Sequence, residues 1–241
     1  MRRHTRAIVV DMPEPDPLEP LLDDWKVADV AIAAVAAIAA VHRRPVSLRR
    51  SDLTGSESVL RGARTSALID DPGVRLSDSP TGGLGAAISV YSLLAPDSLD
   101  ASARTFLRAP LQILARMDVL AGGDGHPIDA RAGARLQGLS RLVSVDTAWA
   151  ALLPVIVHGE ILAHRPFGTR SGVIARAASR LAAVSNGFDP RGLAVPETYL
   201  NRHREEYLAS ADGGYGREFA EVVLQAWVAG AAEAEAIARA A

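Results

Sequence analysis

The sequence predicts an all-α protein, and two observations support that prediction. Hydrophobic residues make up 49% of the 241 residues but only 5% are aromatic, because alanine dominates the apolar positions. Alternating patterns typical of strands are almost absent, whereas helix caps and apolar residues at helical spacing recur along the chain. The exception is a short β-hairpin, predicted as a flap over 123–128. We therefore expect a helical bundle.

The chain divides into an arm and a helical domain. Residues 1–20 hold several prolines after position 12 and little periodicity, so they are expected to form an N-terminal arm. Residues 21–241 are expected to form a single domain, which is long enough to bury a full core.

Four helices are expected in the first half of that domain. The first begins after the N-cap residue Asp24, with an apolar face formed by Trp25, Ala28, Ile32, Val35 and Ala39. The next three are predicted over Ser56–Ile69, Leu84–Leu94 and Pro110–Leu120. Proline is common in the first turn of a helix, so Pro110 supports the start of the last one.

The second half is also predicted to be helical. Asp129 is a candidate N-cap for a helix with Leu136, Leu139 and either Leu142 or Val143 on its apolar stripe. Asp146 is expected to cap the next helix, which carries Trp149 and Ile161 and is kinked at Pro154. Later helices are predicted over Gly172–Asn186, from Pro196 through Tyr207, and over Arg217–Ala241.

Charge and composition exclude several classes of protein. The net charge of −2 provides no global field for nucleic acid or an anionic membrane, so neither is expected as a partner. The absence of cysteine excludes disulfides, thiolate zinc sites and cysteine nucleophiles. Lys26 is the only lysine beside many arginines, which is typical of a GC-rich bacterial genome.

The location is predicted to be cytoplasmic. The N-terminal apolar run is interrupted at Asp11 by an acidic, proline-rich stretch, unlike an export signal. The apolar run Val30–Val41 is too short to span a bilayer and is expected to be a buried helix.

The segment His164–Arg176 has the pattern of a phosphate-binding loop. Pro166 and Phe167 end one helix, and a glycine-containing loop leads directly into the next. The start of a helix presents free backbone N–H groups and the positive end of its dipole, which together attract phosphate. The residues predicted to form this phosphate or nucleotide site are Gly168, Thr169, Ser171, Gly172 and Arg176.

This segment resembles the signature loop of the Fic (Fido) family, His-Pro-Phe-x-Asp/Glu-Gly-Asn-Gly-Arg-x-x-Arg. Pro166, Phe167, Gly172 and Arg176 match it. The resemblance covers 146–186 well and implies a Fic-like fold that binds ATP or another nucleotide and transfers AMP to a protein target. It also implies a buried anchoring role for Phe167. The family often has a histidine seven residues before the catalytic position, which His158 matches, and we expect His158 to be a structural core histidine and not a catalyst.

The departures from the family pattern affect the reactive groups. Arg165 stands where the family has its catalytic histidine, and an arginine stays charged and cannot act as a general base. His164, one residue earlier, is a weak substitute because it lies about 100° around the helix. Thr169 replaces the metal-binding acid, so no metal site is predicted and Mg²⁺ is not expected to bind strongly. A catalytically impaired relative, a pseudoenzyme, is therefore expected.

A second pattern resembles the family's inhibitory motif, Ser/Thr-x-x-x-Glu-Gly/Asn, whose glutamate pairs with the last arginine of the signature loop. Here Ser66 and Asp70 hold the matching positions, and Arg176 is the arginine that remains. The resemblance implies an inhibitory clamp between Asp70 and Arg176.

Two other readings stay open. One alternative to the pseudoenzyme is a non-enzymatic helical protein that binds or regulates a partner. The other is an enzyme with altered chemistry in which His164 or Glu160 is the base. Whether any catalysis remains is undecided by the sequence. The Ala-rich helices are also compatible with a homodimer.

Overall fold

The computed structural model describes residues 24–77, 79–144, 150–212 and 214–241. Helices form in the following order: α1 (Trp25–His42), α2 (Pro45–Arg49), α3 (Ser51–Asp70), α4 (Gly82–Tyr91), η2 (Ser92–Leu94), α5 (Pro96–Arg108), α6 (Pro110–Leu120), α7 (Ala130–Val143), α8 (Leu152–His164), η3 (Gly168–Arg170), α9 (Ser171–Ser185), α10 (Glu197–Arg202), α11 (Arg204–Ser210) and α12 (Arg217–Ala240). The described residues contain no strand, so the all-α prediction is confirmed.

The predicted hairpin over 123–128 is wrong. This segment forms a series of turns that are organised by Asp118 at the end of α6. The main-chain oxygen of Asp118 accepts a hydrogen bond from the N–H of Gly123 at 2.8 Å, and its carboxylate accepts one from Gly125 at 3.0 Å. Because one acidic residue satisfies these donors, the backbone has no need of a cross-strand partner.

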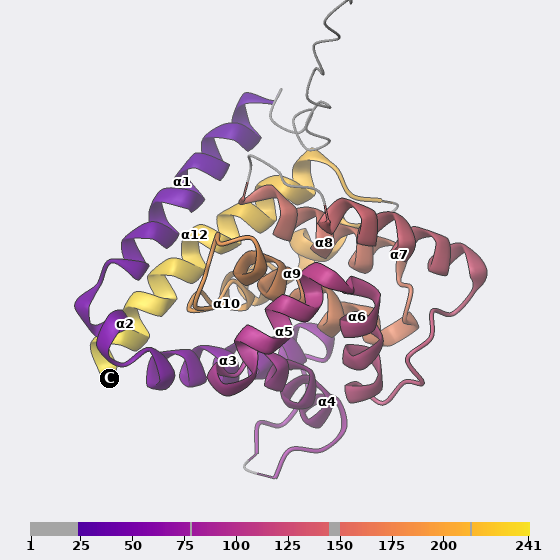
Figure 1. The fold of residues 1–241 in the computed structure, drawn as a ribbon, viewed down its shortest axis with the longest axis horizontal. Coiled ribbons are helices and arrows are strands. Elements are labelled where there is room, and N and C mark those ends of the chain that lie inside the picture. The colour runs from indigo at the N-terminus through magenta and orange to yellow at the C-terminus, as the bar shows by residue number, and fades with distance from the viewer. Residues whose placement is uncertain (1–23, 78, 145–149, 213) are drawn as a thin grey trace, which may run out of the picture.

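Helix α9 lies at the centre of the bundle (Figure 1). Helix α8 packs along it, and α3, α4, α5 and α6 contact it from other sides. All residues from Val173 to Val184 are buried, and alanine is the commonest residue among them. A helix that is apolar around most of its circumference belongs in a core, and small side chains let its neighbours approach closely.

Helix α1 packs along α12 at the edge of the bundle (Figure 1). Its buried face is formed by small and β-branched residues, namely Val27, Ala31, Ala34, Ile38 and Val41. The predicted core face was wrong, because Trp25 is 69% exposed and Ile32 is 61% exposed. Apolar residues surround this helix on nearly all sides, so periodicity did not distinguish the face that packs against the alanines of α12.

Helix α1 is also long and apolar enough to cross a membrane, judged by length and composition alone. It lies near the N-terminus, and 28% of its most apolar window is buried in the fold. Core helices of soluble proteins and signal sequences have the same composition. The cytoplasmic location therefore stays a prediction.

The other helix boundaries differ from the predictions in a few places. Helix α5 was missed because polar residues dominate it, although Leu99, Ala103 and Phe106 form a buried stripe at helical spacing. Pro154 lies in the first turn of α8, where proline is tolerated, rather than at a kink. The predicted arm over 1–20 and the predicted cap at Asp146 lie outside the described residues.

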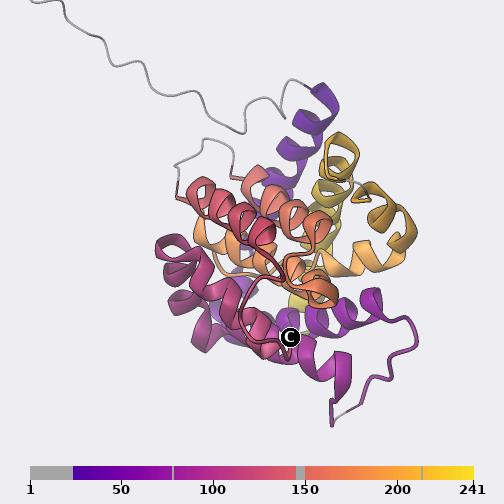
Figure 2. The same cartoon turned by 90° about the vertical axis from the view of Figure 1, so that its right-hand side faces the viewer.

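The connection from α3 to α4 extends away from the helices in both views (Figures 1 and 2). It begins directly after Asp70, the last residue of α3. Asp70 therefore lies where the bundle meets this loop.

Candidate functional site

The 164–176 segment forms a tight helix–loop–helix connection. Helix α8 ends at His164, and Arg165 follows in the left-handed region with φ 45° and ψ 51°. Gly168 also has a positive φ, of 60°, and opens the 3-10 turn η3. Two left-handed residues three positions apart turn the chain sharply, and Gly168 adopts that conformation without the steric cost that a Cβ adds.

Ser171 and Phe167 fix the loop from inside. The N–H of Phe167 donates to the Oγ of Ser171 at 2.9 Å, and both residues are buried. The main-chain oxygen of Pro166 accepts from the N–H of Ile128 at 2.9 Å, which ties this loop to the turns after α6. The hydroxyl of Ser171 is thus already engaged within the loop.

Ser66, Asp70 and Arg176 meet at the start of α9. The guanidinium of Arg176 donates through Nε to the Oγ of Ser66 at 2.8 Å and through Nη2 to the Oδ2 of Asp70 at 2.6 Å. Nη2 also donates to the main-chain oxygen of Ser66 at 3.2 Å. Ser66 and Asp70 precede Arg176 by 110 and 106 residues in the sequence, and hydrogen bonds join the three side chains into one group.

The two charges of this group differ in exposure. The side chain of Arg176 is 1% exposed, whereas that of Asp70 is 38% exposed. Burial opposes the positive charge of Arg176, but Asp70, Tyr207 and Tyr91 together outweigh it, so the pKa of Arg176 is raised. A half-exposed carboxylate therefore covers a buried cation.

Gly172 allows this arrangement. A Cβ at Gly172 would lie 2.6 Å from the Oδ1 of Asp70 and 3.3 Å from the Nη1 of Arg176. The carboxylate thus lies against the first turn of α9, at the positive end of the helix dipole. The Nη1 of Arg176 is buried and has no hydrogen-bond partner among the described residues. The start of α9 already holds an anion and has one unused donor.

His158 and Tyr207 lie beside Arg176 in the core. The Nε2 of His158 and the hydroxyl of Tyr207 are 2.6 Å apart, and both side chains are buried. Burial, and then the charge of Arg176, lower the pKa of His158 to about 3. Burial raises the pKa of Tyr207 to about 12 although Arg176 opposes it. His158 is therefore a neutral core residue near neutral pH.

The other arginines of the loop point elsewhere. The Nε of Arg170 donates to the Oδ1 of the fully buried Asp118 at 2.6 Å. Arg165 and Thr169 are exposed. Of the predicted phosphate-site residues, the structure brings Gly172 and Arg176 together. Ser171 faces Phe167, and Thr169 faces solvent.

Glu160 and His164, the alternative bases, belong to a different cluster. The Glu160 carboxylate accepts two hydrogen bonds from Arg135, at 2.6 and 2.9 Å, and one from the Tyr215 hydroxyl at 3.1 Å. The Nε2 of His164 lies 3.8 Å from the same carboxylate. Burial lowers the pKa of His164, although Glu160 opposes this effect. These partners lie on α7, on α8 and before α12, away from the start of α9.

A second buried arginine was not predicted from the sequence. Arg180 lies one turn after Arg176 on α9 and donates to the Oγ of Ser58 at 2.7 Å and to the main-chain oxygen of Gly192 at 2.9 Å. Its Nη1 lies 3.7 Å from the Oε2 of Glu197, whose Oε1 accepts from the Tyr91 hydroxyl at 2.7 Å. The available signal was two arginines four residues apart, on one face of an otherwise apolar helix.

A metal ion needs a set of ligating side chains that lie together. The described residues contain no group of three or more His, Asp or Glu side chains that could hold a metal ion. A carboxylate lies at a helix start over a buried arginine. Fold and site together define an all-helical protein in which one acidic side chain covers a buried cation.

Comparison with known proteins adds no family to this description. No model of a known protein family matches the chain. A search of curated proteins also finds no match.

Proposed function

We propose that this chain is a degenerate Fic-like domain that binds a nucleotide phosphate at the start of α9 without transferring AMP. The observation that supports it is the Asp70 carboxylate, which lies against Gly172 and contacts Arg176 at 2.6 Å. An anion already occupies this position, so a phosphate of similar charge has a complementary place to bind.

The proposal assigns Asp70 the role of a clamp. Because Asp70 is half-exposed, its side chain can rotate toward solvent while Arg176 stays in place. This movement would uncover two guanidinium nitrogens and the first N–H groups of α9 for a phosphate. The free energy of the Asp70–Arg176 pair would then oppose nucleotide binding.

Loss of chemistry follows from the residues around the site. Arg165 cannot take a proton from a target hydroxyl, and Thr169 offers no carboxylate to Mg²⁺. The proposed ligand is therefore ATP or another nucleotide without a required metal. The proposed setting is the bacterial cytoplasm, with a protein target and without nucleic acid or membrane.

Calorimetric titration with ATP, ADP and AMP, with and without Mg²⁺, tests this proposal. We expect Asp70→Asn to bind nucleotide more tightly than the natural chain, and Arg176→Lys to bind more weakly than either. Asp71→Asn is the matched control, because Asp71 is the exposed neighbour and its carboxylate accepts from Gly73 instead. Absence of binding at millimolar nucleotide in Asp70→Asn would refute the proposal.

A non-enzymatic binding protein is the second candidate, and the outer face of α1 favours it. Trp25 and Ile32 are both more than half exposed on a helix of high apolar content. Such a face is typical of a surface that another chain covers. If that chain is a second copy, sedimentation will show a dimer that Ile32→Glu dissociates. A monomer at high concentration would exclude this arrangement.

A further inference from the structure

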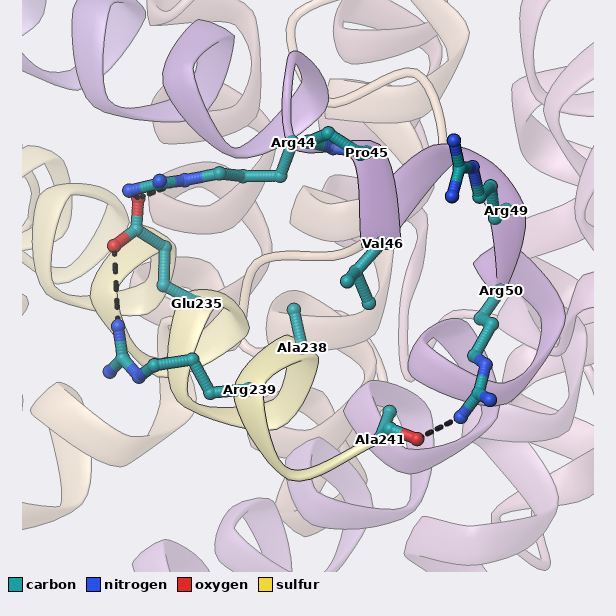
Figure 3. A pocket seen from close by; sticks show the side chains of 9 residues that line it. All are labelled: Arg44, Pro45, Val46, Arg49, Arg50, Glu235, Ala238, Arg239 and Ala241. Atoms are coloured by element: carbon teal, nitrogen blue, oxygen red, sulfur yellow. Dashed lines mark hydrogen bonds and ion pairs between the residues drawn. The ribbon is translucent and has the colours of Figure 1, made fainter.

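A cavity separate from the 164–176 loop lies between α2 and the C-terminal end of α12 (Figure 3). Its volume is about 650 Å³, which lies within the range of small-molecule sites. None of the residues discussed above for nucleotide binding lines it. Any ligand bound there would be independent of the proposed nucleotide site.

The lining of this cavity is strongly basic. Four arginines contribute to it, and Glu235 is the only acidic side chain among its lining residues. The arginines are Arg44, Arg49, Arg50 and Arg239. Guanidinium groups bind carboxylates and phosphates through parallel hydrogen bonds, so this lining selects an anion.

One side of the cavity already holds a carboxylate. The Oε1 of Glu235 accepts from the Nε and Nη2 of Arg44 at 3.3 and 3.0 Å. The Nη1 of Arg239 lies 3.7 Å from the Oε2 of the same side chain (Figure 3). Two arginines therefore share one internal anion on this side.

The opposite side retains positive charge. Arg50 donates to the main-chain oxygen of Ala241. Arg49 has no hydrogen-bond or ion-pair partner within the described part of the chain, and Figure 3 shows its guanidinium at the edge of the cavity. Both side chains are exposed, and an incoming anion would reach Arg49 without displacing an internal acceptor, whereas it would share Arg50 with Ala241.

Aliphatic groups lie between the two basic sides. Val46 and Ala238 face one another across the cavity in Figure 3. The lining residues that the structure describes include no aromatic ring on which a nucleobase could stack. An aliphatic chain would instead cover these apolar groups and gain free energy from their burial.

We propose that this cavity binds an amphiphilic anion, with a phosphate or carboxylate head held by Arg49 and Arg50 and an aliphatic body over Val46 and Ala238. The shared chemistry fits both a soluble alkyl phosphate or fatty acid and the head of an anionic lipid. The head recognises the arginines, and the body fills the space between them and the Arg44–Glu235 pair.

Calorimetric titration of the full chain with octyl phosphate tests this proposal. We expect octyl phosphate to bind about tenfold or more tightly than either inorganic phosphate or octanol, because only octyl phosphate carries both groups. If inorganic phosphate binds as tightly as octyl phosphate, the aliphatic chain contributes nothing to binding. If octanol binds as tightly as octyl phosphate, the anionic head contributes nothing. Either result would overturn the proposal.

Two substitutions should shift the affinity in opposite directions. Arg49→Gln removes a charge without breaking a contact of the fold, and we expect affinity for octyl phosphate to fall about tenfold. Glu235→Gln removes the internal competitor and releases Arg44 and Arg239, so affinity should rise several-fold. Arg202→Gln, an exposed arginine on α10, is the matched control and should change nothing. Unchanged affinity in both test variants would refute the site.

Co-sedimentation with lipid vesicles distinguishes a membrane lipid from a soluble ligand as the source of the anion. Co-sedimentation with phosphatidylglycerol but not phosphatidylcholine vesicles, reversed by octyl phosphate and weakened by Arg49→Gln, would assign the head to a lipid. Binding of octyl phosphate without sedimentation would assign the site to a soluble ligand. No binding of octyl phosphate at millimolar concentration, with no sedimentation, would overturn the proposal entirely.

Discussion

The carboxylate of Asp70 lies 2.6 Å from the guanidinium of Arg176 and closes over it at the start of α9. The two residues come from α3 and α9, and Ser66 joins them by accepting a hydrogen bond from Arg176 at 2.8 Å. This pair links the bundle's central helix to the loop that extends from its surface.

Replacement of Asp70 should destabilise the fold while opening the site. Asp70→Asn leaves the buried charge of Arg176 without its anion, which costs several kcal/mol for a fully buried pair. Because Asp70 is half-exposed, water screens part of that effect, and we expect a loss of about 1–2 kcal/mol. Urea denaturation measures it, with Asp71→Asn expected to stay within about 0.5 kcal/mol of the natural chain.

A side chain at Gly172 is expected to break the contact between Asp70 and Arg176. Alanine normally stabilises a helix interior by about 1 kcal/mol relative to glycine. At Gly172 the added Cβ would lie 2.6 Å from the Oδ1 of Asp70 and push this carboxylate toward solvent, so the loss of the pair, about 1–2 kcal/mol, offsets that gain and we expect Gly172→Ala to lose up to about 1 kcal/mol. Gly138→Ala on α7, where the nearest atom is 3.9 Å away, should be neutral or stabilising. Thermal denaturation of both variants decides this, and a stabilised Gly172→Ala would contradict it.

His158 should make stability depend on pH. Its pKa is lowered to about 3 in the fold, below the ordinary 6.5, so the unfolded chain binds a proton first as pH falls. Stability is therefore lost from about pH 6.5 downward toward pH 3, by about 1.4 kcal/mol for each full pH unit.

Comparison of the natural chain with His158→Gln at pH 7.5 and 5 isolates this contribution from that of the carboxylates. We expect the natural chain to lose about 2 kcal/mol more than the variant over this interval. His126→Gln, which removes an exposed histidine, should keep the natural pH dependence. Equal pH dependence of His158→Gln and the natural chain would count against a neutral buried His158.

The Arg180–Glu197 pair should contribute more than any exposed ion pair. Both side chains are almost completely buried, and Glu197 also accepts from the Tyr91 hydroxyl. Glu197→Gln leaves the Arg180 charge uncompensated in the core, so we expect a loss of about 3–5 kcal/mol. Chemical denaturation measures it against Glu205→Gln, an exposed change expected to be nearly neutral. A loss below about 1 kcal/mol would mean that Ser58 and Gly192 alone satisfy Arg180.

Local signals predicted the helices well because each has its own pattern. Asp24 and Asp129 cap their helices as predicted, with side chains that accept from the N–H groups of Lys26 and Ala132. The apolar face of α1 could not be predicted, because it is chosen by a helix almost 200 residues later. The hairpin prediction over 123–128 was wrong for a similar reason, because a backbone N–H group of this segment is hydrogen-bonded by Asp118, which lies outside it.

The candidate site was partly predictable. The resemblance to the Fic inhibitory motif implied a contact of Ser66 and Asp70 with Arg176, and these three residues lie together in the structure. The contact of Arg170 with Asp118 and the burial of Arg180 depend on helices distant in sequence. No local pattern reports which acceptors those helices present.

The two arginines of α9 also constrain the order of folding. Their acceptors on α3 were synthesised more than a hundred residues earlier, so neither guanidinium can make all of its hydrogen bonds until a long loop has closed. We expect α9 to dock late and together with α3, because docking against other helices first would strand two cations in an apolar interior. A folding intermediate would then keep α9 at the surface, and mutations at Ser58 or Ser66 would speed unfolding more than they slow refolding.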